Sequence, residues 1–307
     1  MNDFAWQFSE SLAGAVEKAA AGVVSIRGRR RRVPSSGILW SEGVVVTAHH
    51  VLEWDEDIEI GLPDGTSTTA SVTGRDPSTD LAALRLAVPA VTAPAATEWA
   101  EAGEVKAGHL IVGLSRPGRK ARARLGIVGG VDEAWRTPMG GRIDADLHTD
   151  LPIHHGYSGS ALMDLKGRVL GVNTAGIYRA TPVVVPTATV RRVMESLLSH
   201  GSVRRGYLGI STQPVRLPAL IAERIGQGTA LLVTSVQPGS PADRAGLVLG
   251  DAITAFEGTP LRHPGELLPL LEEERIGKEA TLSVLRAGEI REIRVTVGTR
   301  NGGGDEG

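Results

Sequence analysis

The chain has 307 residues, more than one ordinary domain needs, so we expect about two compact units. Hydrophobic residues make up 41% and charged residues 22% of the chain, which excludes a fibrous or disordered protein. The formal net charge of −2 gives no overall attraction to nucleic acid, and the lack of cysteine excludes disulfides, thiolate metal ligands and a cysteine nucleophile.

The first 22 residues predict an amphipathic helix, because Phe4, Phe8, Leu12 and Val16 recur at every fourth position. Its apolar side would pack either on its own domain or against another subunit. The segment lacks the basic start and apolar core of a secretory signal, and no apolar run approaches the roughly 20 residues that span a bilayer. We therefore expect a cytoplasmic protein, or a periplasmic or extracytoplasmic one if this N-terminus is not the native one.

Residues 23–186 predict an all-β region, because short runs of apolar and β-branched residues alternate with turns. Many short strands at such spacing are typical of sandwiches and barrels. The stretch 89–108, rich in Ala, Pro and Thr, would connect two β halves. The predicted strands are 23–26, 37–47, 58–62, 70–74, 82–86, 109–113, 126–131, 161–163, 169–174 and 182–185.

Residues 187–200 predict a second helix that ends at Gly201. We expect this helix to belong to a linker, 187–205, that separates two units. Residues 206–300 have strand and helix signals of their own and predict the second unit. The Gly-rich end, 301–307, predicts a flexible tail.

Three separate segments place a histidine, an acid and a serine in the chain order His50, Asp80, Ser158. A serine hydroxyl is a poor nucleophile at neutral pH, so it needs an imidazole to take its proton and a carboxylate to orient that imidazole. Glycines in the run 156–160 allow backbone N–H groups to turn toward a developing oxyanion. Each segment alone is weak evidence, but their joint occurrence predicts nucleophilic catalysis.

These segments resemble the HtrA (Deg) family of trypsin-like serine proteases, which carry a C-terminal PDZ domain. The resemblance covers residues 23–300 and rests on the segments 46–51, 76–84, 149–150 with 156–160, and 167–175. It implies an all-β-dominated fold, a chymotrypsin/trypsin-like double β-barrel in residues 23–186 followed by an α+β PDZ domain in 206–300. It also assigns the base to His50 rather than to His49.

The resemblance implies an ATP-independent serine endopeptidase that acts on unfolded or damaged proteins in protein quality control, without a cofactor. The backbone N–H groups of Gly156 and Ser158 would form the oxyanion hole. No acid stands at the expected base of the specificity pocket, 151–153, so a small apolar side chain before the cut is expected. The substrate cleft implied by the resemblance contains Leu151, Ile153, Tyr157, Val172, Asn173 and Thr174.

The family also implies a homotrimer formed through N-terminal contacts, which makes Phe4, Trp6 and Phe8 candidates for the subunit interface. No membrane span and no nucleic-acid partner are expected.

The serine turn departs from the family pattern, which usually reads Gly-Asn-Ser-Gly-Gly-Pro. Here Tyr157 precedes the serine and Ser160 follows Gly159, and a side chain at position 160 is harmful only if that residue needs a positive φ. Just upstream, His154 and His155 replace the usual Asn-Pro and introduce titratable groups. The alternative function is therefore a catalytically impaired peptide-binding scaffold or chaperone.

Paired histidines at 49–50 and 154–155 and the arginine run 27–32 allow other interpretations. Adjacent strand residues point to opposite faces, so neither pair supplies two metal ligands easily, and we expect no metal site. The arginine run could bind nucleic acid or an acidic partner. Because the rest of the chain is not basic, we favour a solvated loop.

The C-terminal unit resembles a PDZ domain through three motifs in order, 206–210, 236–247 and 250–253. Backbone N–H groups of the segment Tyr207, Leu208, Gly209 and Ile210 would bind the terminal carboxylate of a peptide, while the following strand pairs with its backbone. Leu267 and Leu268, in a predicted helix 264–273, would line the other side of the groove. The expected ligand is a free C-terminus with an apolar last residue.

Overall fold

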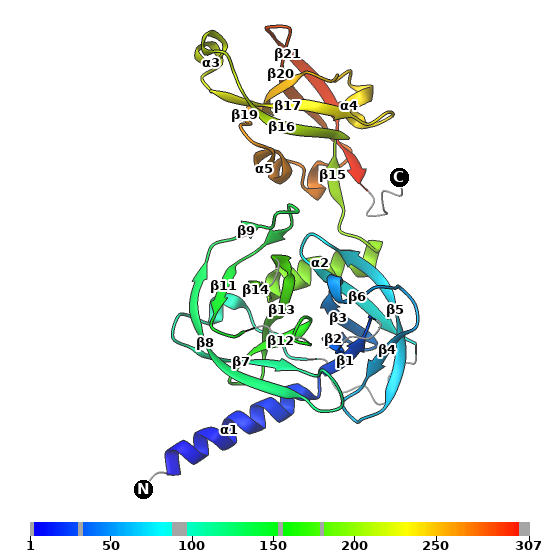
Figure 1. The fold of residues 1–307 in the computed structure, drawn as a ribbon, viewed down its shortest axis with the longest axis vertical. Coiled ribbons are helices and arrows are strands. Elements are labelled where there is room, and N and C mark those ends of the chain that lie inside the picture. The colour runs from blue at the N-terminus through cyan, green and yellow to red at the C-terminus, as the bar shows by residue number, and fades with distance from the viewer. Residues whose placement is uncertain (1–2, 30–32, 88–96, 153–155, 179–180, 301–307) are drawn as a thin grey trace. The chain divides into compact units, whose positions relative to one another are not determined.

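The computed structural model describes residues 3–29, 33–87, 97–152, 156–178 and 181–300 (Figure 1). The chain divides into two compact units, residues 1–203 and 204–307. Strands dominate both, as the sequence predicts. Within the described ranges, every helix is too short or too polar to cross a membrane.

Six strands of the first unit form a closed barrel in the order β1-β2-β3-β6-β5-β4. The predicted run 37–47 is in fact two strands, because Gly43 adopts a left-handed φ of 67° and turns the chain between them. The strands are β1 (Val23–Arg27), β2 (Ser35–Ser41), β3 (Val44–Ala48), β4 (Ile58–Gly61), β5 (Ser67–Asp76) and β6 (Leu81–Leu86). A short 3-10 helix, η1 (His49–Val51), follows β3 directly.

The second half of this unit is a six-stranded sheet in the order β11-β8-β7-β12-β13-β14. Its two end strands, β11 and β14, contact each other, so the sheet curls into a barrel-like shape (Figure 1). The expected chymotrypsin-like fold is thus confirmed. The elements are η2 (Ala102–Glu104), β7 (Leu110–Ser115), β8 (Arg122–Asp132), β9 (Trp135–Arg136), β10 (Arg142–Ile143), β11 (Asp146–Thr149), β12 (Ser160–Asp164), β13 (Val169–Tyr178) and β14 (Thr181–Pro186).

The helix α2 (Thr187–His200) covers the place where the two β halves meet. Four of its apolar side chains are fully buried in a core shared with strands of both halves: Val190, Val193, Met194 and Leu197. Gly201 ends the helix in the left-handed conformation, with φ 74°. Because its apolar face is needed to complete this core, α2 is part of the first unit, and the expectation of a helical spacer is wrong for it.

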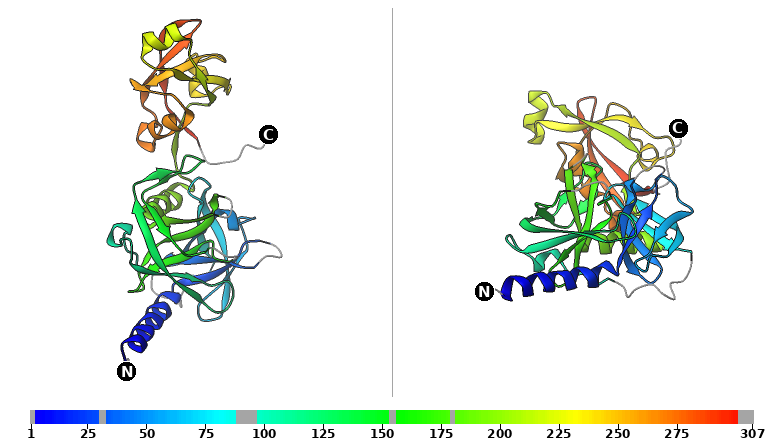
Figure 2. Two further views of the ribbon diagram at one scale, coloured as in Figure 1. Left: turned by 60° about the vertical axis from the view of Figure 1, so that its left-hand side comes forward. Right: turned by 60° about the horizontal axis from the view of Figure 1, so that its bottom comes forward.

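The N-terminal helix α1 (Asp3–Ala20) is buried only at its C-terminal end, where Ala19 joins the shared core and Leu12 and Val16 pack against it. Its N-terminal part extends away from the sheets (Figure 2). There the side chains of Phe4 and Trp6 are 78% and 65% exposed. The predicted amphipathic helix therefore exists, and part of its apolar side is uncovered in the single chain.

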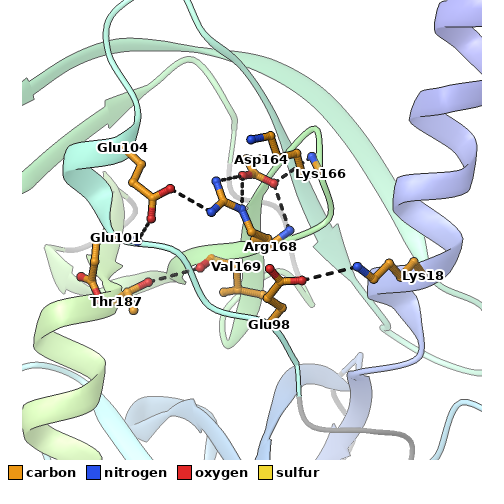
Figure 3. A network of polar contacts seen from close by, with 9 residues as sticks. All are labelled: Lys18, Glu98, Glu101, Glu104, Asp164, Lys166, Arg168, Val169 and Thr187. Atoms are coloured by element: carbon orange, nitrogen blue, oxygen red, sulfur yellow. Dashed lines mark hydrogen bonds and ion pairs between the residues drawn. The ribbon is translucent and has the colours of Figure 1, made fainter.

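Polar contacts hold α1 and the β12–β13 turn to the connection that precedes β7 (Figure 3). Lys18 of α1 pairs with Glu98 at 3.4 Å. Arg168 bridges Asp164 and Glu104, each at 2.8 Å. The Lys18–Glu98 pair is largely exposed, so we attribute the position of α1 mainly to its apolar contacts.

The second unit is a five-stranded sheet, β16-β17-β18-β20-β21, with the pair β15-β22 beside it. The predicted helix 264–273 is interrupted after Leu267, because Pro269 has no N–H to continue it and a 3-10 turn follows. Its elements are β15 (Arg205–Tyr207), β16 (Ile210–Arg216), α3 (Ala219–Ile225), β17 (Thr229–Val236), α4 (Pro241–Arg244), β18 (Ala252–Phe256), β19 (Thr259–Pro260), α5 (Pro264–Leu267), η3 (Leu268–Leu270), η4 (Glu273–Arg275), β20 (Glu279–Arg286), β21 (Glu289–Thr296) and β22 (Gly298–Arg300).

A buried ion pair anchors the start of β18 to the end of β20. The Asp251 carboxylate has no exposed surface and accepts two bonds from Arg286, Nε to Oδ1 and Nη2 to Oδ2, both 2.7 Å long. It also accepts the backbone N–H of Val248 at 2.9 Å. Because a buried carboxylate without partners is costly, this pair fixes the loop before β18.

Replacing Arg286 with Met leaves the Asp251 charge buried and without its counter-ion. We expect the free energy of unfolding of the second unit to fall by about 3 kcal/mol. The matched control is Arg291→Met, which breaks an exposed pair with Glu289 and should change it by less than about 0.5 kcal/mol. Urea denaturation of the full chain measures both, and equal effects of the two substitutions would contradict this account.

Candidate active site

His50 and Asp80 are brought together by the pairing of β3 with β6, in which Ala48 lies opposite Leu81. His50 follows the end of β3 and Asp80 precedes the start of β6, so both lie at the same edge of the barrel. The His50 Nδ1 and Asp80 Oδ2 atoms are 2.7 Å apart. The His50 backbone N–H donates to Asp80 Oδ1 at 2.8 Å. One carboxylate thus fixes both the ring and the backbone of His50.

The Asp80 carboxylate is itself held from the second β half. Its side chain is only 4% exposed, and the Thr174 hydroxyl of β13 donates a hydrogen bond to Oδ2. The Asp80 backbone has a φ of 57°, a left-handed conformation that Asp tolerates better than most side chains. Thr174, predicted for the substrate cleft, is therefore placed to orient the acid.

Gly176 is a residue of this site that the sequence reasoning missed. A Cβ atom at this position would overlap both Asp80 Oδ2 and His50 Nδ1. Its N–H donates to the Thr174 hydroxyl at 3.0 Å. β13 therefore approaches the His50–Asp80 pair so closely that only glycine fits. A glycine two residues after Thr174 carries no such signal by itself.

Ser158 lies on a turn with two left-handed glycines, Gly156 at φ 88° and Gly159 at φ 80°. Ser158 is 8% exposed, and the turn is joined to β13 by the bond from Gly159 N–H to the Asn173 carbonyl, 2.8 Å long. Ser160 begins β12 and is not among the described residues with positive φ. Its hydroxyl accepts a bond from Asn173 Nδ2 at 3.0 Å. A serine at position 160 therefore fits this turn without strain.

A cavity of about 230 Å³ is lined in part by Asn173, the β13 residue whose carbonyl binds the Gly159 N–H of this turn. Of the residues predicted for the cleft, Leu151 and Asn173 line it. Val172 is fully buried in the core, and neither it nor Tyr157 lines the cavity. Ile153 lies outside the described residues. The lining residues are Trp135, Asp146, Leu147, His148, Thr149, Leu151, Asn173, Tyr178, Thr181, Pro182, Val183 and Val184.

Two side chains, Tyr157 and Asp146, have positions that the sequence did not indicate. Tyr157 turns into the sheet, where its ring lies next to Gly113 and under the guanidinium of Arg124, 5.3 Å from the ring centroid. An acid, Asp146 of β11, is part of the lining, 3.4 Å from His148. From the sequence, an acid was looked for only in the segment 151–153, and β11 was not among the predicted strands.

His49, next to the candidate base, faces a different partner. Its Nδ1 is 3.2 Å from Arg75 Nη1, and Arg75 also binds Asp55 and the carbonyl of Leu52. Burial lowers the pKa of His49 below its usual value, and the positive charge of Arg75 lowers it further. The His49 ring thus favours the neutral form, in which Nδ1 accepts from Arg75, whereas the His50 ring binds the Asp80 carboxylate.

The other interpretations of the histidines and arginines find limited support. Within the described ranges, no group of three or more His, Asp and Glu side chains could hold a metal ion. Arg27 pairs with Glu59 at 3.6 Å, and Arg29 donates to the carbonyl of His50. Residues 30–32 and the pair 154–155 lie outside the described residues. The side chains of Arg27 and Arg29, at the start of the arginine run, therefore bind groups of this chain.

The candidate peptide groove of the second unit lies where β16 contacts α5. Gly209 has a φ of 82°, and a Cβ atom there would overlap Ser240. Leu208 and Leu267 are buried in the core, at 2% and 6% exposure, whereas Leu268 is 45% exposed. Tyr207 lies on β15, where its hydroxyl donates to Gln237, and Ile210 begins β16.

Each of the two units matches a known protein family. Residues 35–172 match the family described as trypsin-like peptidase domain, and residues 206–297 match the PDZ domain family. A protein of Chlamydia trachomatis serovar D, named probable periplasmic serine endoprotease DegP-like, is 32% identical over 276 residues, which cover 88% of this chain and 54% of that protein. A protein of the same name from Brucella suis is 32% identical over 269 residues, which cover 85% of this chain and 52% of that protein.

Solved structures match the chain across both units. One described as HtrA-type protease AlgW with decapeptide has a TM-score of 0.72 at 26% identity, covering 94% of this chain and 99% of that one. The serine endoprotease from Yersinia pestis gives a TM-score of 0.72 at 27% identity, with 94% and 98% covered. The chain thus combines a trypsin-like peptidase domain with a PDZ domain, and its relatives and structural neighbours are DegP-like and HtrA-type proteases. The resemblance on which the sequence reasoning relied is thereby confirmed.

The same comparisons correct one expectation. Both DegP-like relatives are named as periplasmic proteins, which contradicts the expectation of a cytoplasmic protein. It rested on the first 22 residues alone. The chain spans about half the length of these relatives, so their activity is considered below as a proposal.

The lowered pKa of His49 makes stability depend on pH in a defined direction. The folded chain favours neutral His49, whereas the unfolded chain protonates it near the usual 6.5. The unfolded state therefore binds more protons as pH falls below 6.5, and stability decreases through the lowered pKa. We expect His49→Gln, which keeps an acceptor for Arg75 but cannot titrate, to flatten the decline of melting temperature as the pH falls below 6.5. Parallel declines in both proteins would rule out His49 as the source.

Proposed function

We propose that the chain is a serine endopeptidase in which Ser158 is the nucleophile, His50 the general base and Asp80 the residue that orients His50. The observation that carries this proposal is the 2.7 Å contact between His50 Nδ1 and a buried carboxylate that Thr174 also holds. Asp80 fixes the ring with its Nδ1–H bonded, which leaves the Nε2 lone pair available as a base. Catalysis needs no cofactor.

The reaction proceeds as in other Ser-His-Asp enzymes. His50 Nε2 takes the proton of the Ser158 hydroxyl as Oγ attacks the carbonyl carbon of a peptide bond, and Asp80 stabilises the imidazolium that forms. The oxyanion accepts hydrogen bonds from the N–H groups of Gly156 and Ser158. His50 then gives its proton to the leaving amine, and water attacks the acyl-enzyme by the same route.

The proposed substrates are unfolded or damaged proteins, cleaved without ATP. The periplasmic names of the relatives support the same compartment for this chain. The AlgW structure with a decapeptide supports peptide binding, and we assign recognition of apolar C-termini to the segment 207–210 and the exposed Leu268. The fit of Ser160 to the turn argues against the non-cleaving scaffold.

Incubation with unfolded casein tests the proposed activity directly. We expect the wild-type chain to produce fragments and to be labelled by a fluorophosphonate probe, and Ser158→Ala to do neither. The rate should fall by on the order of 10⁶-fold, because the triad residues act as a unit. If wild type and Ser158→Ala give the same fragments and labelling, the chain is a scaffold or chaperone.

Gly176 provides a test of the geometry around the base. We expect Gly176→Ala to slow labelling of Ser158 by about 10²-fold or more, because the added Cβ must displace His50 or Asp80. Gly103→Ala is the matched control, since a Cβ there meets nothing within 4 Å and labelling should be unchanged. Equal labelling of the two variants would refute the close approach of β13.

We also propose that α1 forms the interface of a homotrimer. The exposed side chains of Phe4 and Trp6, together with Phe8 at 36% exposure, form an uncovered apolar surface on this helix. We expect light scattering to give three times the chain mass for wild type. Replacing Phe4 and Trp6 with Ser should shift the mass toward monomer. A wild-type monomer at all concentrations would refute the trimer.

A further inference from the structure

Ser36, on β2, forms polar contacts on both sides of the candidate nucleophile. It is fully buried. Its hydroxyl donates to the Gly156 carbonyl at 2.9 Å, and its backbone N–H donates to the Ser158 carbonyl at 3.2 Å. Ser36 thus holds the carbonyls at both ends of the segment 156–158, which carries the N–H and Oγ groups of Ser158.

The turn also packs directly against the residues around Ser36. A Cβ atom at Gly159 would overlap the Ser36 carbonyl, and one at Gly156 would lie 2.9 Å from the carbonyl of Pro34 and 2.7 Å from Pro117 Cβ. There is no space between β2 and the turn for a different path of the chain. Small shifts of β2 or of the loop at 117 would thus change the turn.

Arg116 supports Ser36 from the other side. Its backbone N–H donates to the Ser36 hydroxyl oxygen at 2.9 Å. Its guanidinium donates to the carbonyls of Val23, at 2.6 Å, and of Ala20 and Arg119, each at 2.8 Å. Ala20 is the last residue of α1, so a cation stands at the negative end of that helix.

The burial of Arg116 is unusual for a charged group. The residue is 5% exposed, burial lowers the pKa of its guanidinium, and among the described residues no carboxylate forms an ion pair with it. Burying a cation costs free energy, which hydrogen bonds to carbonyls offset in part. Here the three carbonyls come from the end of α1, from β1 and from its own loop.

We propose that Ser36 is a positioning residue for the Ser158 turn, and that Arg116 connects this turn to the end of α1. The connection consists of three hydrogen bonds. The Arg116 guanidinium donates to the Ala20 carbonyl, the Arg116 backbone N–H donates to the Ser36 hydroxyl oxygen, and the Ser36 hydroxyl donates to the Gly156 carbonyl. The consequence for catalysis rests on the proposed function, since it concerns the oxyanion donors beside Ser158.

The first test removes only the Ser36 hydroxyl. We expect Ser36→Ala to lower kcat for a fluorogenic peptide by on the order of 10²-fold, with KM and the pH midpoint of kcat/KM unchanged, because the His50–Asp80 pair is not touched. Ser25→Ala is the matched control, a buried serine opposite Ser36 on β1. Wild-type kcat in Ser36→Ala, a shifted pH midpoint, or losses equal to those of the control would overturn the proposal.

The second test does not depend on activity. Hydrogen exchange followed by mass spectrometry should show faster exchange of residues 156–161 in folded Ser36→Ala and Arg116→Met, but not in Ser25→Ala. Arg116→Met should also accelerate residues 17–23, and Arg116→Lys should give a smaller effect because one ammonium cannot bridge three carbonyls. Unchanged exchange at 156–161 overturns the proposal even if the wild type is inactive. An inactive wild type with accelerated exchange refutes only the proposed function.

Discussion

The buried carboxylate of Asp80 is the group on which the arrangement of the site depends. It accepts hydrogen bonds from the His50 ring, the His50 backbone and the Thr174 hydroxyl. A carboxylate with 4% exposure is costly to bury without such partners, and these donors come from both β halves of the unit. The position of His50 therefore depends both on the β3–β6 pairing, which brings it to Asp80, and on the packing of β13 against Asp80.

The loop before Asp80 is fixed by equally short contacts. Asp76 accepts hydrogen bonds from the hydroxyls of Ser78 and Thr79, at 2.6 and 2.7 Å, which closes the turn that gives Asp80 its left-handed backbone. The Ser78 carbonyl in turn accepts the Thr137 hydroxyl from the second half at 2.7 Å. The acid and its loop are thus tied separately to the second sheet, so relative sliding of the halves would disturb both.

Much of the site could be predicted from the sequence because its polar residues stand in characteristic local patterns. The order of His50, Asp80 and Ser158, with glycines at the turn, needs no knowledge of the packing. The Thr174 hydroxyl and the missing side chain of Gly176 matter only because β13 passes beside Asp80. Such a role depends on a contact between residues about 95 positions apart, and no periodicity or motif encodes it.

Side-chain directions near the cavity were hard to predict for the same reason. Tyr157 is adjacent to the nucleophile in the chain, but its ring turns into the sheet beside Gly113, since a residue between two left-handed glycine positions does not alternate like a strand. Conversely, Asp146 enters the cavity from a four-residue strand whose own sequence, Asp-Leu-His-Thr, is too polar to predict one. Fold class follows from the average pattern of many strands, whereas cleft composition depends on a few individual side-chain directions.

The contacts of Ser36 extend this reasoning to the helix α1. The apolar end of α1 is part of the core shared by both sheets, and its last carbonyl is held by Arg116. The exposed end, with Phe4 and Trp6, is free to meet another chain. A helix that is rigid over its length transmits a change at one end to the other. If subunits assemble on α1 as proposed, the hydrogen bonds that connect Ala20 with Gly156 offer one route from that interface to the nucleophile turn.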